Sequence, residues 1–288
     1  MLRSLLFVPG DSERKLTAAR DVAASALIMD LEDAVAQPRK SIARATVAEY
    51  LRERRADSRH ELWVRINGLD TAECERDLEA IVPARPAGIV LPKCTPDQLR
   101  ELASKVDDLE AAAGHTSGDI GLIPIVTETP AAVFQLGGYT PNMPRLRGLT
   151  WGAEDLSVVI GANASRDAAG ELLPVFQHVQ SLVVLAAGAA AVQAIDTVYH
   201  RVDDTEGLNK AIYRSRRQGF TAMLAIHPGQ VPVINAAFQP TAEEIEQARR
   251  VVQAFAEAGG TGTIRLDGKM HDQPHLAAAQ RVLSRGQL

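Results

Sequence analysis

Eight short apolar segments, separated by stretches with helical patterns, constrain the fold of this chain more than any other feature of its sequence. Apolar runs of roughly four to eight residues are typical of buried strands, and strands that alternate with helices are typical of parallel sheets. Eight strand–helix units predict an α/β fold, a closed TIM (β/α)8 barrel whose reactive groups lie where the strands end. The predicted strands cover residues 3–8, 26–30, 62–66, 88–91, 121–126, 148–151, 192–198 and 219–226.

Residues 239–288 do not continue this alternation. A helix is predicted to begin after Thr241, because Glu244 follows three residues later in a capping-box pattern. A glycine-bearing extended segment and a final helix come next. We therefore expect a barrel over residues 1–238 and a C-terminal helical extension over residues 239–288 that packs on another subunit.

Composition argues against several classes of protein. The 288 residues carry 31 Lys and Arg against 36 Asp and Glu, intermixed, with a net charge of −5, so neither nucleic acid nor an anionic membrane is an expected partner. Two cysteines are too few for a disulfide framework and fit a reducing compartment. The N-terminal apolar run, Leu5–Val8, is too short for a signal peptide, and the apolar stretch 182–192 is too short to span a membrane. We expect a cytoplasmic protein.

Groups that can bind a metal ion or an anion stand at the ends of seven of the eight predicted strands. Because all strands of a parallel barrel end at one face, we expect these groups to converge there. Such convergence of charge is difficult to explain as a contribution to stability, and it favours an enzyme. The groups are Asp30 and Glu32, Arg65 and Asn67, Lys93, Glu128, Glu154 and Asp155, Asp196, and His227.

Glu128 and Asp155 form the most informative pair, because they follow the fifth and sixth predicted strands, which are neighbours in a barrel. Two carboxylates with water and substrate oxygens suit Mg²⁺, with Mn²⁺ as an alternative. The competing interpretation is that Glu128 caps its own helix and Asp155 pairs with an arginine. Two adjacent carboxylates repel each other unless a cation lies between them, which favours the metal site.

Arg65, at the end of the third predicted strand, can bind a substrate carboxylate through two parallel hydrogen bonds. Its alternative is an internal ion pair with Asp30 or Glu32, and both can hold if those acids fix Arg65 in place. Lys93 is either a Schiff-base lysine or a cation that neutralises charge beside the metal. Asp196 lines the barrel mouth only if its side chain faces inward.

Nine short motifs follow one another along the whole chain: Arg3–Gly10, Asp30–Val35, Val64–Asn67, Leu91–Lys93, Glu128–Thr129, Trp151–Asp155, Ala194–Val198, Ile226–Pro228 and Asp267–Asp272. Each motif is weak alone, but the ordered set resembles the citrate lyase beta-subunit family, which includes malyl-CoA and citramalyl-CoA lyases. The resemblance implies a TIM barrel, trimeric or hexameric, that uses Mg²⁺ to split a 3-hydroxy-acid CoA thioester into a 2-keto acid and a shorter acyl-CoA.

The resemblance also implies roles for individual residues. By it, Glu128 and Asp155 hold the metal, Arg65 holds the keto-acid carboxylate, and Asp272 enters a neighbouring subunit's site, where it is the candidate catalytic base. We expect Glu32 to take part in catalysis beside Arg65. The remaining substrate-binding residues would be Lys93, Asp196 and, toward the CoA nucleotide, Pro9, Gly10, Arg14 and Lys15.

Three alternatives remain open at this point. A malyl-CoA-type thioesterase would share the scaffold but hydrolyse the thioester. A metal-dependent pyruvate aldolase would act on free hydroxy-keto acids without CoA. A non-autonomous subunit of a citrate lyase complex would show no turnover without its partner chain.

Overall fold

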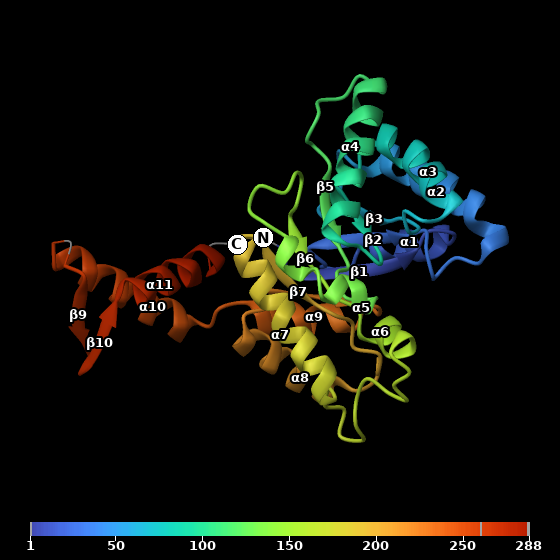
Figure 1. Cartoon of the computed structure of the whole chain (residues 1–288). Coiled ribbons are helices and arrows are strands. Elements are labelled where there is room, and N and C mark those ends of the chain that lie inside the picture. Colours follow the sequence, from blue (N-terminus) through green and yellow to red (C-terminus); the bar gives the residue numbers. More distant parts are fainter. Residues whose placement is uncertain (1, 260, 287–288) are drawn as a thin grey trace. The chain divides into compact units, whose positions relative to one another are not determined.

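The computed structural model describes residues 2–259 and 261–286, and it contains the parallel barrel expected from the sequence (Figure 1). The strand order β5-β4-β3-β2-β1-β8-β7-β6 follows the chain around a ring, and each pair of adjacent strands is parallel. The strands are β1 (Ser4–Pro9), β2 (Ala26–Asp30), β3 (Glu61–Arg65), β4 (Gly88–Leu91), β5 (Gly121–Pro124), β6 (Gly148–Leu149), β7 (Gln193–Asp196) and β8 (Ala222–Ala225).

The ring closes between β5 and the segment that contains β6. Single backbone bridges pair Leu122 with Leu146 and Ile125 with Thr150, both in the parallel sense. The helices that follow the strands are α1 (Glu13–Ala19), α2 (Lys40–Arg54), α3 (Ala72–Ile81), α4 (Pro96–Ala112), α5 (Pro130–Val133), α6 (Ala153–Val159), α7 (Pro174–Ala189), α8 (Thr205–Gln218) and α9 (Gln230–Phe238), with 3-10 turns at η1 (Gln37–Arg39), η2 (Val82–Ala84) and η3 (Leu136–Gly138).

Local capping signals place two of these helices directly after their strands. At α4, the Thr95 side chain accepts a hydrogen bond from the backbone of Gln98, whose side chain accepts one from the Thr95 backbone, and Pro96 occupies the first helical position. At α5, the Thr129 side chain accepts a hydrogen bond from the Ala132 backbone, and proline follows at the first helical position. A helix that begins so soon after its strand holds the residues between the two at the barrel mouth.

Alternation along the strands decides which side chains enter the barrel. The inner cluster consists of Leu2, Leu5, Ala26, Ile28, Trp63, Val90, Ile123, Ile125, Ile195, Ala222 and Leu224. Because successive strand residues point to opposite faces, Asp30 continues the inner row of Ile28, and Arg65 continues that of Trp63. The same rule places Asp196, next to Ile195, on the outer face of β7.

The indole of Trp63 fills the lower part of this interior, near the starts of β4 and β5. It is fully buried, and its N–H donates a 3.0 Å hydrogen bond to Glu61. A Cβ atom built on Gly88 would lie 2.1 Å from Cζ3 of the indole, and one on Gly121 would lie 3.2 Å from its Cη2 atom. These glycines are therefore needed for space against the ring, not for a turn.

We expect Gly88→Ala to lower the free energy of unfolding by about 3 kcal/mol, since the added methyl group must displace a fully buried ring. Urea unfolding monitored by circular dichroism measures the change. Gly188→Ala on α7 is the matched control, because its methyl group would meet no atom within 4 Å and alanine favours the helix. Equal destabilisation by both substitutions would contradict the packing argument.

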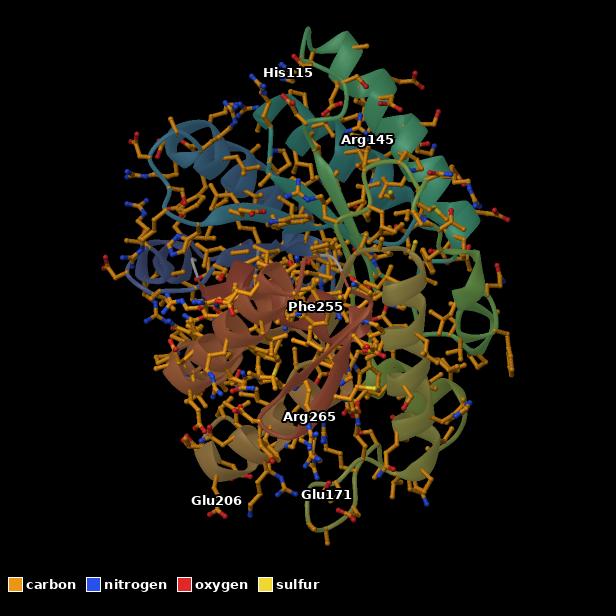
Figure 2. The ribbon with its side chains drawn as sticks, turned by 90° about the vertical axis from the view of Figure 1, so that its left-hand side faces the viewer. His115, Arg145, Glu171, Glu206, Phe255 and Arg265 are labelled. Carbon is orange, nitrogen blue, oxygen red and sulfur yellow. The ribbon has the colours of Figure 1, made fainter. Side chains whose placement is uncertain are left out.

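Contacts divide the chain into two compact units, one of which is Leu2–Asn235 and the other essentially Ala236–Leu288. The second contains α10 (Ala242–Glu257), the antiparallel strands β9 (Thr263–Leu266) and β10 (Lys269–Asp272), and α11 (Gln273–Gly286). Its own apolar core includes Phe255, which is labelled in Figure 2 with Arg265 of β9.

The extended segment predicted in this unit is in fact a β-hairpin. Asp267 and Gly268 form its turn, and both have positive φ, as a tight two-residue hairpin turn requires. Among the described residues of the chain, no helix combines the length and apolar character that crossing a bilayer requires.

Candidate active site

Two acidic residues hold Arg65 in a fixed orientation inside the barrel mouth. Its Nε and Nη2 atoms donate to the two Asp30 oxygens at 2.7 and 2.6 Å, and its Nη1 atom lies 3.0 Å from Oε2 of Glu32. The Phe7 ring lies against the guanidinium, 4.7 Å from centroid to carbon. The internal ion pair anticipated for Arg65 is therefore present, and contact with substrate stays a prediction.

The electrostatics of this group keep Arg65 charged. Burial lowers the pKa of the Arg65 guanidinium, but the hydrogen bonds and charge of Asp30, with Glu32, outweigh burial and leave the pKa above its usual range. Burial acts in the other direction on Glu32 and raises its pKa, although the charges of Arg65 and Lys93 oppose the rise. A cation fixed in this way is suited to bind a carboxylate of the substrate.

Lys93 links Glu32 to the predicted metal pair. Its backbone N–H donates to Oε2 of Glu128 at 2.5 Å, while its Nζ atom lies 2.8 Å from Oε1 of Glu32 and 3.7 Å from Oδ1 of Asp155. The backbone of Lys93 has φ = 53°, which non-glycine residues seldom adopt and which is often found at functional sites. This conformation accompanies the turn that directs its N–H at Glu128.

The ammonium group of Lys93 is also kept charged. Burial lowers its pKa, but the hydrogen bond and charge of Glu32, together with the charges of Glu128 and Asp155, leave the pKa above its usual range. A Schiff-base lysine must instead be available as a neutral amine. The contacts therefore favour a lysine that neutralises negative charge.

Glu128 and Asp155 follow two strand ends that are in close contact with each other. Glu128 is buried, while the Asp155 side chain is 37% exposed. A Cβ atom on Gly152 would lie 2.9 Å from Cγ of Glu128, so the helix that carries Asp155 begins directly against Glu128. Burial, and then the charge of Asp155, raises the pKa of Glu128 to about 8. A cation between these groups would relieve both effects.

These residues fit a magnesium ion better than a metal held wholly by protein. No cluster of three or more His, Cys, Asp or Glu side chains suited to a metal exists among residues 2–259 and 261–286. Mg²⁺ commonly takes one or two carboxylates and completes its shell with water and substrate oxygens. Oε2 of Glu32 is buried and accepts no hydrogen bond of good geometry, although it lies 3.0 Å from Arg65. It offers an acceptor for a bound water.

The structure does not bring Asp196 to this site. Its carboxylate is buried on the outer side of β7, where it accepts hydrogen bonds from Trp151, Gln180 and Ser215. The inward orientation that substrate contact would require is therefore not the one observed.

The N-terminal residues assigned to CoA lie where β1 ends and α1 begins. Gly10 donates to the Asp30 carbonyl at 2.9 Å, and a Cβ atom there would lie 2.7 Å from that oxygen, so only glycine fits. Pro9 ends β1, and Arg14 and Lys15 are exposed in the first turn of α1. Their contact with CoA stays a prediction.

Asp272 belongs to the C-terminal unit, at the end of β10. Its Oδ1 atom lies 2.5 Å from Nδ1 of His275, and this hydrogen bond lowers the pKa of Asp272 below its usual range. The His275 ring also stacks edge-on against His271, with centroids 5.1 Å apart. The role of Asp272 in a neighbouring subunit remains a prediction. At the end of β8, His227 accepts a hydrogen bond from the nearby backbone of Gly229.

Sequence reasoning missed two residues that support the site. Phe7 lies under Arg65, and its inward position follows from alternation with Leu5, a signal that the sequence contains. Lys40 is buried and donates to the carbonyl oxygens of Leu31 and Glu32, at 2.8 and 2.9 Å, and to the Asn67 side chain. No local sequence pattern indicates that a lysine at the start of α2 donates hydrogen bonds to the loop that follows β2.

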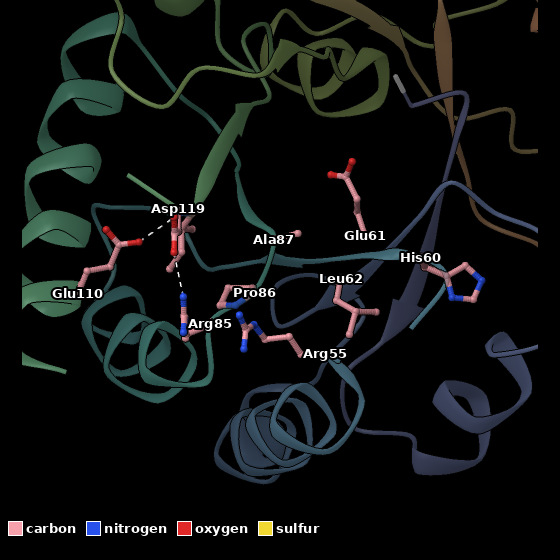
Figure 3. A pocket seen from close by; sticks show the side chains of 10 residues that line it. Arg55, His60, Glu61, Leu62, Arg85, Pro86, Ala87, Glu110 and Asp119 are labelled. Carbon is pink, nitrogen blue, oxygen red and sulfur yellow. Dashed lines mark hydrogen bonds and ion pairs between the residues drawn. The ribbon is translucent and has the colours of Figure 1, made fainter. Parts of the chain in front are cut away.

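A cavity of about 360 Å³ lies at the opposite end of the barrel (Figure 3). It is lined by Glu61 and Leu62 at the start of β3, by Ala87 before β4 and by Ile120 before β5. It contains none of the residues assigned to catalysis, metal or substrate. Because reactive groups of such barrels lie at the C-terminal ends of the strands, this cavity is not the candidate active site.

Several known proteins are similar to this chain over nearly its whole length. A family model described as HpcH/HpaI aldolase/citrate lyase matches residues 3–228. The (3S)-malyl-CoA thioesterase of Cereibacter sphaeroides is 35% identical over 288 residues, covering 99% of this chain and 94% of the relative. The citrate lyase subunit beta-like protein of Mycobacterium tuberculosis is 34% identical over 281 residues, covering 97% and 94% respectively.

A solved structure is similar along its whole length. The protein CitE from Mycobacterium tuberculosis, in complex with magnesium, acetoacetate and coenzyme A, is 32% identical to this chain with a TM-score of 0.78. The match covers 99% of this chain and 98% of that one. Magnesium, a keto acid and CoA are thus ligands of a structurally similar protein.

Proposed function

The chain belongs to the HpcH/HpaI aldolase/citrate lyase family, and from that premise we propose that it is a Mg²⁺-dependent carbon–carbon lyase. Its substrate would be a 3-hydroxy-acid CoA thioester such as malyl-CoA or citramalyl-CoA, cleaved into, or formed from, a 2-keto acid and a shorter acyl-CoA. The observation that carries the proposal is the convergence of Glu128 and Asp155 with Lys93 and Arg65 at one end of the barrel.

Arg65 would bind and orient the carboxylate beside the carbon that becomes the keto group. Its guanidinium is already fixed by Asp30 and Glu32, so little side-chain freedom is lost when the substrate binds. Lys93 would offset the negative charge that accumulates where two carboxylates and an anionic substrate meet. When bound by Glu128 and Asp155, Mg²⁺ would supply Lewis-acid polarisation of the substrate oxygens.

Cleavage also requires two proton transfers. The substrate hydroxyl loses its proton as its carbon becomes a carbonyl, and the electrons of the broken C–C bond pass to the α-carbon of the departing thioester, which then takes up a proton. In the condensation direction a base removes that α-proton instead, and Asp272 is our candidate. If a neighbouring copy delivers Asp272, the active form is a homo-oligomer, a trimer or hexamer in our proposal, acting in the cytoplasm.

A thioesterase is the second candidate, because a relative that is 35% identical over nearly the whole chain is a (3S)-malyl-CoA thioesterase. In that reaction water attacks the thioester carbonyl, and the carbon skeleton of the acid stays intact. A pyruvate aldolase acting on free acids and a non-autonomous citrate lyase subunit are the remaining alternatives. The products formed distinguish the three enzymes, whereas a non-autonomous subunit alone would form none.

The test is to incubate the purified protein with Mg²⁺ and malyl-, citramalyl- or methylmalyl-CoA, and to identify the products by mass spectrometry. We expect release of a keto acid and a shorter acyl-CoA, and loss of this release in EDTA. Free CoA together with the intact hydroxy acid would instead establish a thioesterase. Absence of turnover with every thioester would refute both activities, and free hydroxy-keto acids would then test the aldolase.

A further inference from the structure

A buried carboxylate outside the barrel interior gathers hydrogen bonds from several elements. Asp196, at the end of β7, accepts from the Trp151 indole at 2.7 Å and from the Thr197 backbone at 2.8 Å, and also from Gln180 of α7 and Ser215 of α8. Only 3% of the residue is exposed. Burying a carboxylate costs free energy unless its acceptors are satisfied. An apolar side chain would fill the same space without that cost, so packing alone does not account for Asp196.

The indole bond connects Asp196 to the strand end that precedes Asp155, one of the two predicted metal ligands. Trp151 is fully buried and is followed immediately by Gly152, the residue that caps α6. The next residues, Ala153 to Asp155, form the first turn of that helix. A rotation of Trp151 would therefore turn the start of α6 and shift Asp155.

A second contact joins this strand end to Glu128. The Thr127 hydroxyl accepts a hydrogen bond from the Gly152 N–H at 3.1 Å and donates to the Gly152 carbonyl at 3.2 Å. Thr127 is fully buried and directly precedes Glu128. The two segments that carry the metal pair are thus fastened to each other by Thr127 and Gly152, and to the outer helices by Trp151 and Asp196.

We propose that Asp196 is a positioning residue that, through the Trp151 indole, fixes the start of α6 and so sets the affinity of Glu128 and Asp155 for a divalent cation. The inference rests on the proposed metal site. It assigns Asp196 a role outside substrate contact, at a place where the side chain faces α7 and α8. Removing a residue that orients a metal ligand typically weakens metal binding by about 10- to 100-fold.

The experiment measures Mn²⁺ binding to the whole protein by the electron paramagnetic resonance signal of the free ion, so it does not depend on turnover. Trp151→Phe keeps an aromatic ring but removes the N–H donor together with the five-membered ring of the indole, and we expect it to weaken binding about tenfold. Asp196→Ala should have the same effect. Asp196→Asn should bind within about threefold of the unaltered protein, because its amide oxygen still accepts from Trp151 and the Ser215 hydroxyl can accept from its NH₂ group.

Gln193→Leu is the matched control at the other end of the same strand. Gln193 is hydrogen-bonded to the backbone of Leu2 and donates to the Thr221 side chain, so its loss also breaks partly buried hydrogen bonds of β7. We expect its Mn²⁺ affinity to stay within about twofold, and Trp151→Phe to have no further effect in the Asp196→Ala background.

Unchanged affinity in Trp151→Phe would overturn the positioning role, and so would equal weakening by Asp196→Asn and Asp196→Ala. Weakening by Gln193→Leu as large as that by Trp151→Phe would also overturn it, by showing a general effect of lost stability. Absence of Mn²⁺ binding to the unaltered protein would refute the metal site itself, and with it this proposal. If Asp196→Ala does not fold, Trp151→Phe still decides the question.

Discussion

Glu128→Gln is expected to lower kcat/KM for the thioester by about a thousandfold. The substitution keeps the size of the side chain and its ability to accept from the Lys93 backbone, but removes one of the two charges that would hold the cation. A bound Lewis acid supplies several kcal/mol of transition-state stabilisation, and a loss of about 4 kcal/mol corresponds to three powers of ten. Steady-state assays at saturating Mg²⁺ measure the change.

The same substitution should act in the opposite direction on stability. Glu128 is buried beside Asp155, and burial and that negative charge both disfavour its ionised form, as its raised pKa shows. We therefore expect Glu128→Gln to raise the unfolding temperature of the protein in EDTA at neutral pH. A variant that is inactive yet more stable cannot owe its inactivity to misfolding.

Glu110→Gln provides the control for Glu128→Gln. Glu110 is also buried, and it accepts from Arg145, Gly118 and Ile120 at the other end of the barrel. Its replacement should cost stability and leave kcat/KM within about threefold. Wild-type activity in Glu128→Gln would exclude Glu128 as a metal ligand, whereas equal losses of activity in both variants would indicate a general effect of removing a buried glutamate.

Asp272→Ala is expected to fold, to bind Mn²⁺ like the unaltered protein, and to lose between a hundred- and ten-thousandfold in kcat, roughly the range that a general acid or base contributes. Its carboxylate is partly exposed, and among the described residues its side chain is hydrogen-bonded to His275 alone, so its removal disturbs little of the C-terminal unit. Full activity in this variant would exclude Asp272 as the base.

Mixing variants tests whether Asp272 acts in a neighbouring copy. If each site combines Glu128 of one copy with Asp272 of another, co-expressed Glu128→Gln and Asp272→Ala chains form some sites with neither substitution. We expect such mixtures to recover part of the activity that each variant lacks alone. The mass of the oligomers shows whether they contain both chains. If such mixed oligomers recover no activity, then either Asp272 and Glu128 of one copy act in the same site or Asp272 is not the base.

The barrel could be predicted because its signals are local and repeated. Each strand is a short apolar run, and helices such as α4 and α5 begin at a threonine followed by proline immediately beyond a strand. Because all strands of such a barrel end at one face, the predicted barrel also predicts that the groups at the strand ends lie at that face. Lys93 indeed lies within 4 Å of both Glu128 and Asp155. The roles of those groups in metal and substrate binding remain proposals.

The orientation of Asp196 could not be read from the sequence. Strands of a parallel barrel are buried on both faces, and the apolar residues of the run from Val192 to Val198 do not alternate with its polar ones, so the run does not mark its inner side. Only the register of β7 against β8, in which Ile195 pairs with Ala222, decides it. The β9–β10 hairpin differs in this respect, because its turn has a local signal in the sequence, the dipeptide Asp267-Gly268, at which the expected single extended segment folds back on itself.

The backbone of Lys93 has a consequence for how this position can be studied. Two separate contacts meet at one residue, an ammonium group that reaches Glu32 and a main-chain N–H that reaches Glu128. Alanine scanning reports on the first alone, because every amino acid except proline retains the second. The positive φ further narrows the replacements that evolution can accept at this position toward glycine and asparagine. A homologue that lacks the lysine can therefore still hold Glu128 through the backbone N–H of this position.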